Sequence, residues 1–173
     1  MKTKKLKNGR NILEPGDKID GEELLVEVVV WIKDGKYHRE DGPAIEWPSG
    51  NKEWYLDGKC HREDGPAVEY LGLRQWFING KCHREDGPAE VIGDGTNCWY
   101  LNGKRHRKDG PAIENANGTK EWYLNGIKHT EEEFNLANTQ PALVVPVILP
   151  VERIKVIRKM ATSDVVSDKK LKS

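Results

Sequence analysis

Short segments in which apolar and polar residues alternate recur along most of the chain, and this period of two indicates β-strands. In the segment EWYL, Trp54 and Leu56 lie on one side of such a strand and Tyr55 lies on the other. Related segments follow at regular intervals and predict two aromatic rows on opposite faces of a sheet. The Trp row consists of Trp54, Trp76, Trp99 and Trp122. The Tyr/Phe row consists of Tyr55, Phe77, Tyr100 and Tyr123.

Two aromatic rows are unusual, because a sheet with one face in water carries polar residues on that face. Either the sheet curls until both faces are covered, or one row stays exposed and binds a partner. For the Trp row we favour packing in a core, where each cross-strand pair contributes about 0.2 to 1 kcal/mol. For the Tyr/Phe row both alternatives remain open.

The alternating segments belong to an internal repeat. The five histidines recur every 22 or 23 residues, and five of the six tryptophans keep the same interval. Each of these tryptophans is followed three residues later by Asp-Gly or Asn-Gly. Such a pair predicts a two-residue hairpin, because a type I′ turn needs positive φ at both central positions. The heptapeptide HREDGPA, or HRKDGPA in the last copy, then ends the second strand, since its proline cannot donate to a β-ladder.

These signals predict a mainly β fold, an elongated antiparallel meander of tandem β-hairpin repeats of about 23 residues with short C-terminal helical segments. We divide the chain into a basic N-terminal arm at 1–23, the repeat array at 24–129, a C-terminal cap at 130–160 and a tail at 161–173. We expect the tail to be disordered. The apolar segment LLVEVVVWIK at 24–33 is expected to open the sheet.

The predicted cap begins with a helix signal. Thr130 is followed three residues later by Glu133, which forms a capping box, and the helix is expected to end near Ala137. A proline-rich connector follows. Beyond it, apolar residues recur every third position among Arg and Lys, at Val151, Ile154, Ile157 and Met160. This amphipathic segment is predicted either to cover the aromatic surface of its own chain or to recruit a partner.

Composition narrows the class of protein. Only 36% of the 173 residues are hydrophobic, which fits a thin, elongated fold better than a thick core. Because 28 basic residues balance 28 acidic ones, we expect no attraction to a membrane, and nucleic acid contacts only through the basic termini. The longest apolar run, at 141–151, is too short and proline-rich to span a bilayer, and no signal peptide is evident. We therefore predict a cytoplasmic protein.

The repeat unit W-Y-x-[DN]-G-K-x-H-R-x-D-G-P-A, which covers roughly 24–137, resembles a divergent MORN-type repeat. It resembles even more the HRxDGPA repeat proteins of tailed bacteriophages, large viruses and bacteria. The chain has Arg where the MORN pattern has Gly, so MORN-type lipid binding is not expected. The segment PAEVI at 88–92 also exchanges the polar and apolar positions of PAVEY. The resemblance implies a protein-binding scaffold without catalytic chemistry, such as a phage accessory protein or an inhibitor of a host defence factor.

The repeated polar residues raise the question of a chemical site. If each repeat contributes two strands about 4.8 Å apart, equivalent histidines lie about 10 Å from each other. That spacing is too long for a shared zinc ion, whose ligand bonds measure about 2.0 Å. We therefore predict no catalytic residue, metal or cofactor. In one interpretation Asp holds the turn while Arg and His bond nearby groups, and in the other the polar row binds an acidic or phosphate-bearing ligand. This row, the His/Arg strip, consists of His38, Arg39, His61, Arg62, His83, Arg84, His106 and Arg107.

Two function classes follow. The first is a non-enzymatic repeat scaffold that binds another protein through the Tyr/Phe row and the His/Arg strip. The alternative is a binder of a nucleotide or another phosphate-bearing small ligand. An uncovered sheet edge also predicts a homodimer. Cys60 and Cys82 hold equivalent places about 10 Å apart, too far for a disulfide, and we expect them and Cys98 to be reduced.

Overall fold

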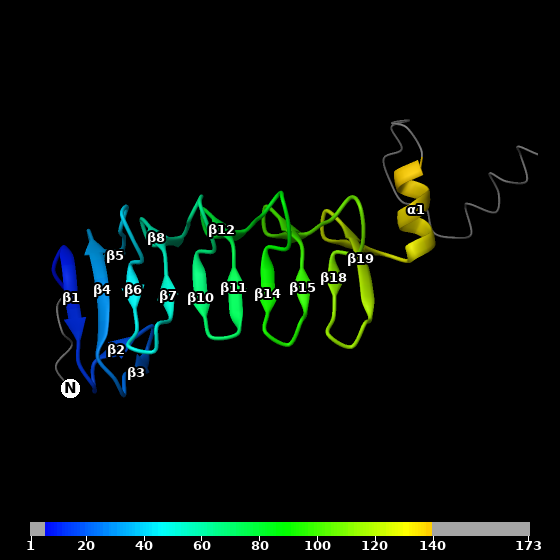
Figure 1. Ribbon diagram of the computed structural model, residues 1–173. Coiled ribbons are helices and arrows are strands. Elements are labelled where there is room, and N and C mark those ends of the chain that lie inside the picture. Colours follow the sequence, from blue (N-terminus) through cyan, green and yellow to red (C-terminus); the bar gives the residue numbers. More distant parts are fainter. Residues whose placement is uncertain (1–5, 140–173) are drawn as a thin grey trace, which may run out of the picture. The chain divides into compact units, whose positions relative to one another are not determined.

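The computed structural model describes residues 6–139, which form a long antiparallel sheet with one helix at its C-terminal end (Figure 1). In spatial order, the main sheet contains β1 (Gly9–Leu13), β4 (Val28–Lys33), β6 (Ile45–Glu46), β7 (Lys52–Glu53), β10 (Val68–Tyr70), β11 (Leu73–Gln75), β14 (Glu90–Ile92), β15 (Asn97–Cys98), β18 (Ile113–Glu114), β19 (Lys120–Leu124) and β20 (Ile127–His129), with β5 (Lys36–Tyr37) beside β4. Separate two-stranded ribbons are formed by β2 (Lys18–Ile19) with β3 (Glu22–Glu23), β8 (Tyr55–Leu56) with β9 (Lys59–Cys60), β12 (Phe77–Ile78) with β13 (Lys81–Cys82), and β16 (Tyr100–Leu101) with β17 (Lys104–Arg105). The predicted mainly β class is confirmed.

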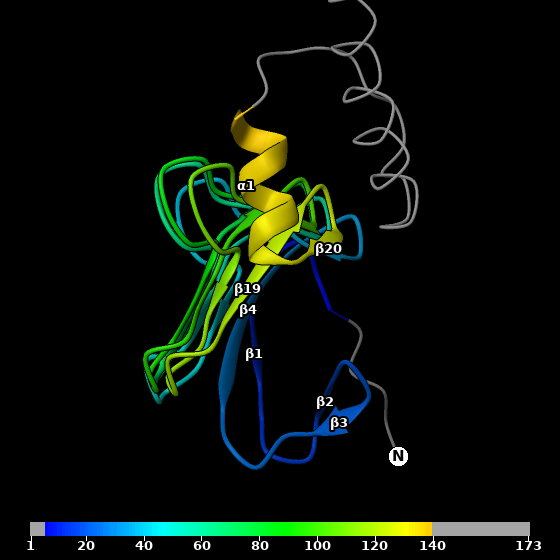
Figure 2. The same ribbon diagram turned by 90° about the vertical axis from the view of Figure 1, so that its right-hand side faces the viewer.

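In the three central repeats the tryptophan interrupts the strand, at Trp54, Trp76 and Trp99. β7 ends at Glu53 and β8 begins at Tyr55, and the Trp54 N–H at this bend donates to the carbonyl of Ala67 (2.8 Å). The segment before the bend belongs to the main sheet, and the segment after it forms a short hairpin. In the end-on view of Figure 2 the sheet forms a stem, and loops leave its upper end on two sides. The hairpins lie on the side of β20, and the HRxDGP loops lie on the other side.

The hairpins form the predicted turns. The Asx residue of every hairpin has positive φ, from 49° at Asp34 to 53° at Asn125, and the following glycine is also positive. Hydrogen bonds join successive hairpins, as in the 2.8 Å bond from the Gly80 N–H to the carbonyl of Cys60. The array is therefore connected along the main sheet and along the row of hairpins.

The core is thin, and the alanine of the heptapeptide occupies its tightest position. These alanines are fully buried in all four copies, at Ala44, Ala67, Ala89 and Ala112. The first three donate across the sheet, as Ala67 does to Gln75, and all four accept from the tryptophan of their repeat. Among the described residues, a larger apolar cluster lies near the N-terminal end and consists of Leu13, Leu24, Val28, Val30, Ile32 and Ile45. The heptapeptide is thus a structural element of the array.

The start of the sheet differs from the prediction. Residues 24–33 do not open it, because β1 pairs with β4 and forms the edge, so part of the predicted basic arm belongs to the sheet. Leu13, which is 2% exposed, explains this pairing, since it packs with Val28 and Val30 in the N-terminal cluster. Strand β4 begins only at Val28, and Leu25 before it is 86% exposed.

The C-terminal capping box is confirmed. Helix α1 (Glu131–Thr139) follows Thr130, whose N–H donates to Glu133 Oε2 (3.0 Å), while the Glu133 N–H donates to Thr130 Oγ1 (3.2 Å). Phe134 is 3% exposed, and α1 packs against β19 and β20. In the part of the chain that is described, no helix has the length and apolar character needed to cross a bilayer. The proline-rich connector, the amphipathic segment and the tail lie outside the described residues.

Candidate interaction site

The first feature of each HRxDGP loop is an arginine stacked on a tryptophan of the same repeat. The guanidinium carbon of Arg62 lies 4.1 Å from the centre of the Trp54 ring. Equivalent distances of 4.0 to 4.2 Å join Arg39 to Trp31, Arg84 to Trp76, and Arg107 to Trp99. The planar guanidinium prefers this position, because it is attracted to the negative face of the ring. The loop is thereby fixed over the bend in the strand.

Further hydrogen bonds occupy the same arginine. Arg62 donates through Nε to Asp64 Oδ1 (2.8 Å) and through Nη1 to the carbonyl of Pro66 (3.2 Å) and to Glu69 Oε1 (3.0 Å). The glycine of the loop leaves room for this group, because a Cβ on Gly65 would lie 2.9 Å from the Arg62 guanidinium carbon. These contacts account for the Arg, Asp and Gly of the heptapeptide.

One copy departs from this scheme. Arg84 keeps its bonds to Asp86 and to the Pro88 carbonyl, but Val91 stands where the other copies have a glutamate. The exchanged order of PAEVI causes this difference, because it places Glu90 one position earlier in the strand. There the carboxylate of Glu90 accepts a hydrogen bond from Gln75 Nε2 (2.7 Å). Arg84 thus has one acidic partner fewer than Arg62.

The histidines connect each repeat to the next. The backbone N–H of Asn79 donates to His61 Nδ1 (3.1 Å), and the corresponding bonds measure 3.0 to 3.1 Å at His38, His83 and His106. The side-chain oxygen of the same Asx residue also lies 2.9 to 3.2 Å from Nδ1 of His38, His61 and His83. A glutamate oxygen lies near Nε2 in these three copies, at 3.4 Å from His38 and 3.7 Å from His61 and His83. At His106 the backbone N–H of Asn125 donates to Nδ1, which leaves the proton of the neutral ring on Nε2. The histidine thus joins the loop of one repeat to the hairpin of its neighbour.

The fourth histidine lacks this glutamate. Lys108 replaces it, and His106 Nε2 is buried with no hydrogen-bond partner. Burial lowers the pKa of His106, and the positive charge of Lys108 lowers it further. The last loop therefore contains an unsatisfied donor that the other three avoid.

The His/Arg strip is therefore largely used within the array. The side chains of His38, His61 and His83 are only 10 to 18% exposed, and those of the four arginines are 20 to 26% exposed. The groups in solvent are the acidic residues beside them, which are 78 to 84% exposed. We call this set the acidic rim: Glu40, Asp41, Glu63, Asp64, Glu85, Asp86 and Asp109. These residues were not predicted as a site, although Glu and Asp follow the arginine together in every copy of the heptapeptide but the last.

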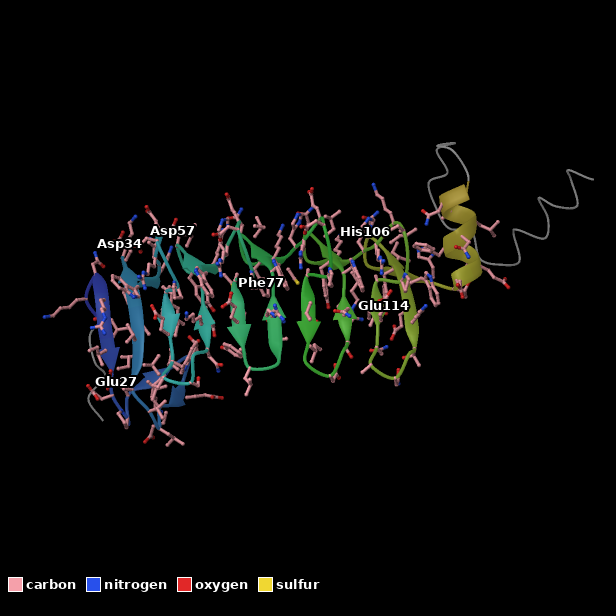
Figure 3. All side chains as sticks on the ribbon, viewed as in Figure 1. Glu27, Asp34, Asp57, Phe77, His106 and Glu114 are labelled. Atoms are coloured by element: carbon pink, nitrogen blue, oxygen red, sulfur yellow. The ribbon has the colours of Figure 1, made fainter. Side chains whose placement is uncertain are left out.

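The aspartates of the rim are held in their charged form. The hydrogen bond from Arg39 lowers the pKa of Asp41, and the arginine of each other loop does the same for Asp64, Asp86 and Asp109. Figure 3 shows Asp57 and His106 at the edge of the array that carries the loops, and Glu27 at the opposite edge. The rim is thus a charged feature of one edge.

Grooves separate neighbouring loops. The first groove has a volume of about 760 Å³ and lies between the loops that contain Arg39 and Arg62, with Trp54 and Leu56 in its lining. The second has a volume of about 840 Å³ and lies between the loops that contain Arg84 and Arg107. Trp99 and Leu101 line the second groove at the equivalent positions. The repeat thus produces two grooves with the same apolar residues and similar volumes.

The side chains of the Tyr/Phe row are half-buried. The row is therefore neither fully covered nor fully exposed to a partner. Tyr55 stacks on Tyr37 with ring centres 5.5 Å apart, and its hydroxyl donates to Glu53 (2.7 Å). Arg105 lies over the Tyr123 ring at 5.4 Å. Burial also raises the pKa of Tyr55 above its ordinary value. Side chains of the array itself therefore cover much of this row.

The cysteines carry no reactive signature. All three are free thiols, and burial raises the pKa of Cys60 and Cys82 to about 12 and that of Cys98 to about 11. Such thiols hold little of the nucleophilic thiolate at neutral pH. Within residues 6–139, no group of three His, Cys, Asp or Glu side chains is arranged to hold a metal ion.

Comparison with known proteins adds no relative. No family model, no curated protein and no solved structure matches the chain. The resemblance to MORN-type and HRxDGPA repeats therefore stays a prediction from the residues. The function has to be argued from the loops, the rim and the grooves.

Proposed function

We propose that this chain is a non-enzymatic repeat scaffold that binds another protein along the edge formed by its HRxDGP loops. The observation that supports this proposal is the recurrence, in register, of one groove and one pair of exposed carboxylates along a single edge. Stacked repeats offer extended surfaces of this kind. A protein segment that follows the edge meets the same chemistry at regular intervals.

The rigidity of the loops favours binding. Each loop is fixed by an Arg–Trp stack, by the arginine hydrogen bonds and by a histidine bond to the next repeat. A surface that is ordered before it meets its partner loses less conformational entropy on binding. The polar residues of the heptapeptide thus act indirectly, because they position the exposed groups beside them.

The alternative of a phosphate-bearing ligand has weaker support. The donors that would hold a phosphate are engaged, since Arg39 bonds Asp41, Pro43 and Glu46. The exposed carboxylates of the rim would repel a phosphate at the mouth of either groove. We therefore retain protein binding as the proposed function. On the resemblance, we further propose that the partner is a bacterial protein, and we keep the prediction that binding occurs in the cytoplasm.

Site-specific photo-crosslinking in bacterial cells tests the proposal. A photoreactive amino acid replaces Glu63 on the rim in one version of the full chain and Glu27 at the opposite edge in the other, both residues being exposed. Circular dichroism checks that both versions fold. We expect a discrete crosslinked protein from position 63 that is missing from position 27. The same products from both positions, or none from position 63, would refute the proposal.

A further inference from the structure

We infer that the segment bound by this edge is extended and basic, with Lys or Arg at every third residue. This inference rests on the proposed function and names the chemistry of the partner. It is carried by three observations together: the charge of the rim, the apolar residues of the grooves and the spacing of the repeats.

The charges around the first groove do not cancel. Four carboxylates line it, from Glu40, Asp41, Glu63 and Asp64, against the two guanidinium groups of Arg39 and Arg62. The carboxylates thus outnumber the guanidinium groups by two. Around the second groove, Lys108 equalises the count of acidic and basic groups. A cationic segment is therefore attracted mainly to the first three loops.

The lining of the groove suits the side chains of such a segment. Trp54 and Leu56 lie in the groove, while the carboxylates stand at its exposed mouth. Long basic side chains bury their methylene groups on apolar surface and keep the charged end in water. A lysine can thus lay its stem against the groove and place its ammonium group among the carboxylates.

The repeat distance sets the spacing in the partner. Two strands of each repeat enter the main sheet, as β10 and β11 do, so equivalent rim positions are about 10 Å apart for strands about 4.8 Å apart. A segment in the extended polyproline II conformation advances about 3.1 Å per residue and completes one turn in three residues. Every third residue therefore lies on the same face of the segment and meets an equivalent position. Because single exposed ion pairs are weak, a segment that matches several loops binds more tightly than one that matches a single loop.

Synthetic peptides test the inference. One fluorescent peptide of twelve residues has lysine at every third position and Ala or Thr between. A second peptide of the same composition has its lysines in one contiguous block. Fluorescence anisotropy measures the binding of each to the full chain. We expect the spaced peptide to bind at least about tenfold more tightly and to lose affinity as salt is added. Equal affinity for both peptides, or no binding of either, would overturn the inference.

A matched pair of variants locates the site. The triple change Glu40→Gln, Glu63→Gln and Glu85→Gln removes three exposed charges and leaves the Asp–Arg bonds in place. The control removes three exposed charges at Glu22, Glu23 and Glu27. We expect the rim variant to bind the spaced peptide about tenfold more weakly and the control to bind as before. Equal weakening by both would show attraction to net charge and overturn the inference.

The two proposals can fail separately. If position 63 still crosslinks a protein while the spaced peptide does not bind, the proposed function stands and the basic partner is excluded. If the spaced peptide binds but position 63 crosslinks no protein, the edge binds cations without serving as a protein interface in the cell.

Discussion

Replacement of Lys108 by glutamate should stabilise the last repeat, most clearly at acidic pH. In the other loops a glutamate oxygen lies 3.4 to 3.7 Å from the histidine Nε2, whereas His106 Nε2 is buried without a partner. An unsatisfied buried donor costs about 1 to 3 kcal/mol, but a long, solvent-exposed bond recovers only part of this. We expect a gain of about 0.5 kcal/mol in the free energy of unfolding at pH 7.5.

The pH dependence gives the sharper result. Burial and Lys108 lower the pKa of His106 in the folded chain, below the unfolded value of about 6.5. The unfolded chain therefore binds the proton more readily, and stability is lost as pH falls below that value. Lys108→Glu removes one cause of the depression, so less stability should be lost between pH 7.5 and pH 5.0.

Urea denaturation of both chains at the two pH values measures this effect, and an NMR titration of the His106 ring follows its pKa directly. The control is Lys120→Glu, which makes the same change of charge at an exposed position. The reasoning is refuted if Lys108→Glu and the original chain lose equal stability on acidification, or if Lys120→Glu reproduces the gain.

Three further predictions concern the structural residues of the repeat. Ala67→Leu should lower the free energy of unfolding by about 1 to 3 kcal/mol in urea denaturation, because Ala67 is fully buried and a larger side chain overpacks the bend. The control Ala116→Leu, at an exposed position, should change the free energy of unfolding little. An equal loss in both variants would contradict the explanation. Arg62→Lys should cost about 1 kcal/mol by the same assay, through loss of the planar stack and paired bonds. Arg84→Lys should cost less, since Arg84 lacks the glutamate partner, and the reverse order would count against this account. The three thiols should react slowly with iodoacetamide at pH 8 in the folded chain and rapidly in urea, because burial raises their pKa to about 11 or 12. Rapid labelling of the folded chain would contradict this prediction and show that the thiols are accessible.

Sequence reasoning placed the hairpins, the meander and the capping box of α1 because these depend on neighbouring residues. An Asx-Gly pair adopts its turn through its own backbone preference, and Thr130 reaches Glu133 within one turn of helix. The candidate site was harder to predict. The heptapeptide was predicted to be mainly structural, and the groups chosen as interaction residues are partly buried and engaged in contacts within the array.

The tertiary structure decided which residues of the motif face solvent. His61 bonds the turn at Asn79, 18 residues away, and Arg62 lies over Trp54 from the preceding strand. The histidine contact forms only after one repeat has packed on the next, and the arginine stack forms only once its own repeat has folded back over the strand. The same holds for β1, whose pairing depends on the fit of Leu13 into a cluster assembled from distant strands. The sequence by itself determined the period and the turns, which are local, whereas burial and exposure were decided by packing between segments far apart in the chain.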